Sequence, residues 1–100
     1  MKKYIYEIWD KETYKKSDSP AYKDYDYLFS SLEELEKIGA SEIISNFCDE
    51  FNEHVYLGNG FEKKDLVVCF LEINPNGKEK IIKSLNYKNE LIDLDSYFKE

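Results

Sequence analysis

The first nine residues alternate between two sets of side chains. Tyrosine and isoleucine occupy one set of positions, and the other set is Ile5, Glu7 and Trp9. A period of two places the two sets on opposite faces of an extended chain, and aromatic and β-branched residues favour strands. The pattern therefore predicts a β-strand over residues 1–9.

The next stretch, residues 10–27, is polar and rich in tyrosine. The sequence Ser-Asp-Ser-Pro at residues 17–20 is typical of a break between elements. We interpret the stretch as a loop, with a short strand near residues 25–29. Eighteen residues is long for a connection without structure. Such a length indicates a functional loop or an element that the pattern does not reveal.

Residues 31–39 have the pattern of an amphipathic helix. Ser31 and Glu34 have the spacing of a capping box, and Ser30 with Glu33 offers the alternative register. Apolar residues then recur three or four positions apart, namely Leu28, Leu32, Leu35 and Ile38. Gly39 is a suitable residue to end this helix.

Residues 41–55 predict a second and stronger helix, for which Ser41 is a suitable N-cap. An apolar residue recurs at every fourth position, with Ile44 and Cys48 beside this stripe. The members of the stripe are Ile43, Phe47, Phe51 and Val55.

Residues 65–87 predict a β-hairpin. Its first strand is apolar on both faces as far as Glu72, which is typical of a central strand. Asn-Pro-Asn-Gly at residues 74–77 suits a tight turn. On the returning strand we expect Ile81, Lys83, Leu85 and Tyr87 to share one face.

The last residues, 90–98, carry Leu91, Leu94 and Phe98 at helical spacing and predict a short final helix. The whole pattern predicts one α+β domain over residues 1–100. We expect a small antiparallel sheet, made of the N-terminal strand and the C-terminal β-hairpin, with two helices packed on one face.

The composition excludes several classes of protein. The 100 residues carry a formal charge of −7, with fourteen lysines and no arginine, so the chain is a poor binder of nucleic-acid phosphates. No apolar run approaches the roughly 20 residues that span a bilayer. We expect no signal peptide and, with two cysteines, no disulfide scaffold. These features favour a cytoplasmic protein without membrane or direct nucleic-acid contacts.

The negative charge is concentrated in one part of the chain. Residues 24–54 hold nine acidic residues and a single lysine, Lys37. The outer faces of helices are commonly charged for solubility alone, and that explanation stays open. A face built for stability would mix the two signs, because like charges four residues apart repel. An uncompensated acidic face is useful where a basic partner relieves the repulsion.

Tyrosines lie beside this acidic part of the chain. Tyr14, Tyr22, Tyr25 and Tyr27 alternate with aspartates in the polar stretch, and tyrosine is enriched in protein interfaces. The same rings could instead cover one edge of the core. We expect the acids and rings to contact a basic partner through Tyr22, Asp24, Tyr25, Asp26, Tyr27, Glu42, Asp49, Glu50 and Glu53.

Catalytic and metal chemistry has little support in the sequence. His54 follows Glu50 by four residues and could share its helix face, but a histidine near a helix end is commonly structural. Cys48 and Cys69 are expected to be buried small hydrophobes, and the acids near Cys48 would raise its pKa. One histidine and two separated cysteines do not make a zinc site. We therefore expect no enzyme activity, metal or cofactor.

Three hypotheses for function follow. The first is an inhibitor, immunity or anti-defence protein that blocks the basic, nucleic-acid-binding surface of a larger partner. The second is an adaptor that homodimerises through an apolar patch of Tyr4, Tyr6 and Trp9. The third is a module for a nucleotide or another small molecule, bound near the lysine clusters Lys63, Lys64, Lys78 and Lys80. The first hypothesis fits the charge distribution best, and the chain would then be a monomer or a homodimer.

Overall fold

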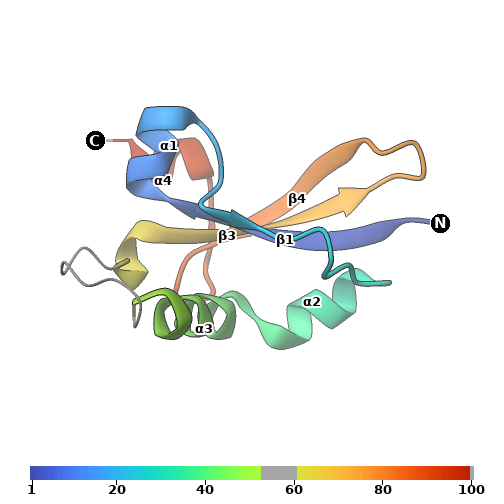
Figure 1. Ribbon diagram of the computed structural model, residues 1–100, viewed down its shortest axis with the longest axis horizontal. Helices are drawn as coiled ribbons and strands as arrows, with labels where there is room; N and C mark the ends of the chain where they lie inside the picture. The colour runs from blue at the N-terminus through green and yellow to red at the C-terminus, as the bar shows by residue number, and fades with distance from the viewer. Residues whose placement is uncertain (53–60, 100) are drawn as a thin grey trace.

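A computed structural model describes residues 1–52 and 61–99, and the side chains at 51 and 52 lie outside the description. The elements occur in an order that mixes strands and helices (Figure 1). They are β1 Lys3–Asp10, α1 Lys11–Ser17, β2 Tyr22–Lys23, α2 Leu32–Ile38, α3 Ala40–Asn52, the 3-10 turn Lys63–Asp65, β3 Leu66–Ile73, β4 Glu79–Leu85, β5 Leu91–Ile92 and α4 Leu94–Phe98.

The five strands form one antiparallel sheet in the order β2-β1-β3-β4-β5. All eight residues of β1 pair with β3, from Lys3 opposite Ile73 to Asp10 opposite Leu66. The central strand β3 is buried from Leu66 to Leu71, which confirms the central position that its apolar run predicts. The α+β class and the C-terminal hairpin are also confirmed.

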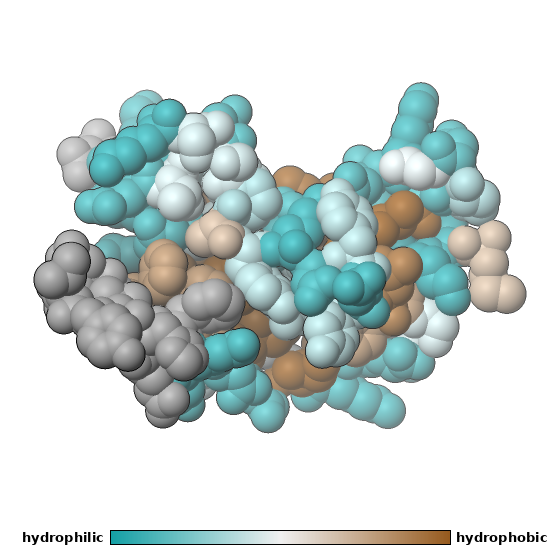
Figure 2. Space-filling view, viewed as in Figure 1, coloured by the Kyte–Doolittle hydropathy of each residue, from teal (hydrophilic) through white to brown (hydrophobic). Residues whose placement is uncertain are grey.

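Helices cover both faces of the sheet. In Figure 1, α2 and α3 lie below the sheet, and α1 and α4 lie above one end of it. Each layer has its own buried cluster, and Figure 2 shows hydrophobic residues across the middle of the molecule with hydrophilic ones above and below. The α2/α3 layer packs on Ile8, Val68 and Phe70, whereas the other layer packs on Ile5 and Trp9 with Phe98 of α4.

The interpretation of residues 10–27 as a loop is wrong at its start, where α1 forms. The Asp10 carboxylate accepts a hydrogen bond from the backbone N–H of Glu12 at 3.1 Å and caps this helix. No residue of α1 is buried, so the apolar periodicity that predicts helices is missing. The short strand lies at Tyr22–Lys23 rather than at 25–29, where only Phe29 makes an isolated bridge to Tyr4.

The prediction that Ile81 shares a face with Lys83 and Leu85 on the returning strand is wrong, because β4 contains a bulge. Phe70 lies opposite Lys83 and Leu71 opposite Ile81, so one extra residue of β4 falls between these pairs. Because opposed residues share a face, Lys83 faces the α2/α3 layer with Phe70, and Ile81 lies on the other face with Leu71. Ile81 therefore does not share a face with Lys83 and Leu85.

Candidate functional site

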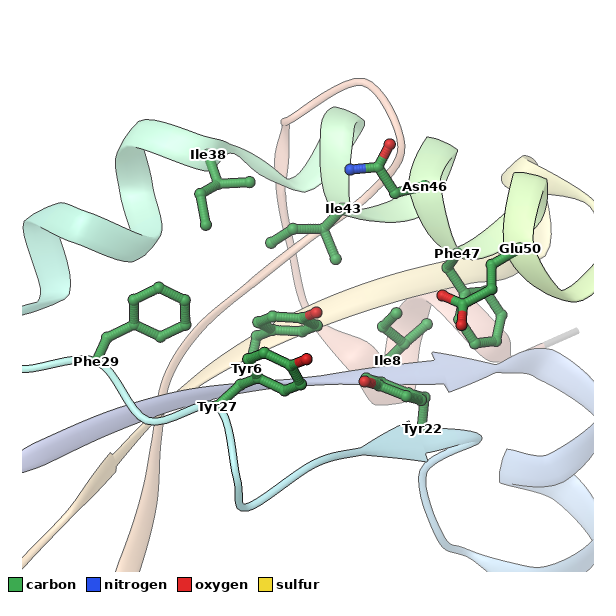
Figure 3. A pocket seen from close by; sticks show the side chains of 10 residues that line it. All are labelled: Tyr6, Ile8, Tyr22, Tyr27, Phe29, Ile38, Ile43, Asn46, Phe47 and Glu50. Atoms are coloured by element: carbon green, nitrogen blue, oxygen red, sulfur yellow. The ribbon is translucent and has the colours of Figure 1, made fainter.

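The main candidate site is a pocket of about 180 Å³ between the sheet and the α2/α3 layer. Five aromatic side chains line it, together with three isoleucines, one amide and one carboxylate (Figure 3). They are Tyr6, Ile8, Tyr22, Tyr27, Phe29, Ile38, Ile43, Asn46, Phe47 and Glu50. Of the described residues that line the pocket, Glu50 alone is charged at neutral pH and none is basic.

Strand alternation positions the floor of the pocket. Tyr6 and Ile8 are two residues apart on β1 and so face the α2/α3 layer together. Tyr22 on β2 lies opposite Ile8, and its ring stacks on Tyr6 with centroids 6.2 Å apart and planes inclined by 26°. The Tyr22 ring also meets the edge of Phe47 at 5.9 Å. The floor is therefore a set of rings that hold one another in place.

The segment after β2 forms the outer wall. The Asp24 carboxylate accepts a hydrogen bond from the backbone N–H of Asp26 at 2.9 Å, which fixes a local turn. Three residues later, Phe29 exchanges two backbone hydrogen bonds of 2.8 Å with Tyr4. Between these anchors stands Tyr27, 63% exposed, with its ring against the pocket. Hydrogen bonds therefore anchor this wall at both ends.

Negative charge gathers at the mouth of the pocket. Figure 3 shows the hydroxyls of Tyr6, Tyr22 and Tyr27 converging on one region of the pocket, toward which the Glu50 carboxylate projects from α3. Burial raises the pKa of Tyr6 and that of Tyr22, the latter to about 12, and the carboxylates of Asp24 and Glu50 add to both increases. The smaller carboxylate contributions show that Asp24 and Glu50 place negative potential at these hydroxyls, which favours a positive ligand.

Helix α3 extends this acidic region away from the pocket. Glu42, Asn46 and Glu50 follow one another at intervals of four residues. Asp49 follows Asn46 by three, so all four lie along one broad side of the helix. All four are exposed, and of the four Asn46 and Glu50 line the pocket. We call Asp24, Asp26, Glu42, Asp49 and Glu50 the acidic rim. The ninth expected residue, Glu53, lies outside the described residues.

Tyr25 does not join the other expected residues. It is exposed, and its hydroxyl donates to the Glu79 carboxylate on the opposite face of the sheet. Lys23, next to Tyr22 in the strand, also points to that face, where it forms ion pairs with Glu7 at 3.1 Å and Glu79 at 2.5 Å. The structure therefore brings Tyr22, Tyr27 and Glu50 together in the pocket and directs Tyr25 elsewhere.

Several pocket residues were missed by the sequence reasoning. The sequence placed Tyr6 in the N-terminal strand and in the dimer patch, Phe29 in a short strand, and Ile38 and Phe47 on the apolar stripes of helices; Asn46 received no role. Asn46 precedes Glu50 by four residues and follows Glu42 by four, which places it on the acidic side of the helix. That spacing was a usable signal, whereas the meeting of Tyr6 with Phe47 depends on tertiary packing.

The residues expected for the other two hypotheses are scattered. Trp9 is only 8% exposed and lies on the face opposite Tyr4 and Tyr6, so the three do not form one apolar patch. Lys63 and Lys64 precede β3, and Lys78 follows it after the turn. An eight-residue strand, about 26 Å long, separates the two lysine clusters.

The two cysteines are buried and free, as expected. Burial raises the pKa of Cys48, with a smaller increase from Asp49, and raises that of Cys69 to about 11. His54 lies outside the described residues, so its pairing with Glu50 is not described. Among residues 1–52 and 61–99, no group of histidine, cysteine or acidic side chains is arranged to hold a metal. No helix in these ranges is long and apolar enough to cross a bilayer.

Fold and pocket together define a small α+β domain with an acidic, aromatic pocket beside its sheet. No protein-family model matches the chain, and neither a curated protein nor a solved structure matches it. Its function is therefore inferred from its own residues.

Proposed function

We propose that this chain is a non-enzymatic, cytoplasmic binding module whose acidic rim covers the basic surface of a larger protein, as an inhibitor of a nucleic-acid-handling partner would. One observation carries the proposal: the described lining of the aromatic pocket contains Glu50 and no cation, and the acidic rim continues from Glu50 along α3. Folding brings Asp24 and Glu50, 26 positions apart in the chain, to act on the same tyrosines.

Charge and tyrosine together suit such a partner. Carboxylates form charge-assisted hydrogen bonds with lysine and arginine, and tyrosine rings provide contact area at a small entropic cost. An acidic surface also accelerates the encounter with a basic protein, an effect that salt reduces. The partner's own nucleic-acid site is a natural target, because it is already shaped for negative charge.

Homodimerisation through the sheet edge has less support. In the described part of the chain, β5 pairs only with Ser84 and Leu85 of β4, which leaves the other end of β4 open. That open end carries Glu79, Lys80 and Lys83 and contains the bulge. Charged residues and bulges are the features by which proteins discourage pairing between sheet edges.

The experiment is a capture assay with two charge-reversed variants. In the test variant, Glu42→Lys and Asp49→Lys reverse two charges of the acidic rim that do not line the pocket. In the control variant, Glu12→Lys and Glu62→Lys make the same change in net charge on the α1 side of the molecule. Glu12 and Glu42 both lie in the first turn of a helix, so these two changes have a matched effect on the helix dipole.

We expect the wild type and the control variant to retain the same basic protein from a lysate of the source organism or its host. The test variant should bind that protein at least about tenfold more weakly, because two attractions become repulsions. Retention should fall as salt rises toward a few tenths molar. Equal binding of the purified partner by the test and control variants would contradict the proposal.

A further inference from the structure

The pocket has the chemistry of a receptor for a positively charged group. The faces and edges of five aromatic rings surround it, and the electron-rich face of an aromatic ring attracts cations. Glu50 supplies a full negative charge at its lining, and Asp24 lies close enough to act on Tyr6 and Tyr22. An anionic ligand would be repelled by both carboxylates.

The size of the pocket limits what can enter. Its volume of about 180 Å³ is slightly larger than the roughly 150 Å³ of an apolar cavity that holds benzene. A group of about six heavy atoms therefore fits, which is the size of the end of a lysine or arginine side chain. A nucleotide is too large to enter with more than a fraction of its atoms.

The chain's own nearby lysine is held elsewhere. Lys23 adjoins Tyr22 but lies on the other face of the sheet, paired with Glu7 and Glu79 and 5.1 Å from the centre of the Tyr25 ring. Lys23 and Tyr25 form a cation–aromatic contact on the face of the sheet opposite the pocket. The aromatic lining of the pocket allows a contact of the same kind with a cation from another molecule.

We propose, building on the proposed function, that this pocket receives a lysine or arginine side chain from the surface of the basic partner. The cation lies among the rings of Tyr6, Tyr22 and Tyr27 and pairs with the Glu50 carboxylate. The acidic rim attracts the partner over a distance, and the pocket fixes its position. Tyr22 and Glu50 then determine which basic residue of the partner is recognised.

The test uses small probes and needs no partner. N-acetyl-lysine methylamide and N-acetyl-arginine methylamide carry the two cationic side chains. Their neutral counterparts, with an Nε-acetylated lysine or with citrulline, have nearly the same shape without the charge. Each probe is titrated into the isotopically labelled protein, and backbone and aromatic chemical shifts are followed by NMR.

We expect saturable shifts for at least one cationic probe, centred on Tyr22, Tyr27, Phe47 and Glu50. The neutral counterpart should bind about tenfold more weakly or worse, because it loses both the carboxylate and the ring attraction. Glu50→Gln should weaken binding of the cation by about tenfold. Tyr27→Ala should weaken it too, and Tyr27→Phe should restore binding, because the ring face is what the cation contacts.

Glu42→Gln is the matched control, since it removes the same charge from the same side of α3 outside the pocket. It should leave the affinity for the probe within about twofold, because Glu42 does not line the pocket and salt screens its charge from the bound cation. The inference is overturned if no cationic probe gives saturable shifts, if neutral probes bind equally, or if Glu42→Gln and Glu50→Gln weaken binding alike. It is also overturned if tetramethylammonium binds and neither amino-acid probe does.

The two proposals fail in different ways. If the probes bind but reversal of Glu42 and Asp49 leaves partner capture unchanged, the rim proposal fails and the pocket remains a site for basic side chains. If capture depends on the rim but no probe binds, the pocket proposal alone fails.

Discussion

At the scale of single residues, the side chain of Asn89 caps the N-terminus of α3, which begins 49 positions earlier in the chain. Its side-chain oxygen accepts a hydrogen bond of 2.9 Å from the backbone N–H of Ala40, the first residue of α3. The expected N-cap, Ser41, is instead inside the helix, where its hydroxyl donates to the backbone oxygen of Tyr87. Both contacts attach α3, and with it Asn46 and Glu50, to the segment that follows β4.

Replacement of Asn89 tests this cap. Asn89 has a φ of 65°, which glycine also adopts without strain, so Asn89→Gly removes the acceptor alone. Because Ala40 is buried, its N–H would lose the Asn89 oxygen as its acceptor, and the free energy of unfolding should fall by about 1–2 kcal/mol. Asn89→Asp keeps the acceptor and should change the value by less than about 0.5 kcal/mol. Urea denaturation measures both, and equal effects of the two variants would contradict the assignment.

At the scale of elements, the short strand β2 is held in place by an ion-pair network. Lys23 reaches Glu7 of β1 and Glu79 of β4, and so spans the intervening strand β3. Burial alone would lower the pKa of Lys23, but its bonds with Glu79, Tyr25 and Glu7 outweigh this effect and raise it. The Glu7 side chain is 5% exposed and also accepts a hydrogen bond from the Trp9 indole at 2.8 Å.

Lys23→Met should be clearly destabilising, because it leaves the Glu7 carboxylate buried without its cation. We expect a loss of about 2–3 kcal/mol, below the full cost of breaking a buried pair because Lys23 is partly exposed. Glu79→Gln should cost about 1 kcal/mol or less, since Glu79 is 30% exposed and the Glu7–Lys23 pair remains. Thermal and urea unfolding provide the measurement, and a Lys23→Met variant as stable as Glu79→Gln would show that the network does not hold β2.

At the scale of the whole molecule, two helical layers share one sheet. Cys48 belongs to the buried cluster under α2 and α3, and Cys69 to the cluster under α1 and α4. Both clusters include residues of β1 and β3. Unfolding of either strand would therefore expose the buried residues of both layers. We therefore expect the domain to unfold in one cooperative step.

Chemical labelling of the two thiols can measure whether the two layers unfold together. Burial keeps both thiol pKa values raised, so at about pH 8 each native thiol should react with iodoacetamide on the order of a hundredfold slower than in the unfolded chain. Cys48→Ala and Cys69→Ala each leave one thiol to follow. As urea increases, the two rates should rise together. Rapid labelling of one thiol while the other stays protected would reveal separate unfolding of the layers.

Local pattern predicted most of the elements. The alternation of residues 1–9, the doubly apolar run of β3 and the Asn-Pro-Asn-Gly turn gave the antiparallel sheet, and the stripe through Ile43 and Phe47 gave α3. These features depend on neighbours in the sequence, which the sequence displays. Helix α1 was missed because its stability comes from the Asp10 cap and from contacts of Tyr14 with Trp9 and Phe98, and not from an apolar stripe.

The sequence by itself determined the composition of the candidate site: the excess of acids, the absence of arginine and the tyrosines before the helices. Only the tertiary structure decided which of these residues meet. It stacked Tyr22 on Tyr6, bonded the Tyr25 hydroxyl to Glu79, and brought Asp24 and Glu50 close enough to Tyr22 for both carboxylates to act on it. The physical reason is that strand pairing and core packing join residues far apart in the chain, and no local pattern records which partners they select.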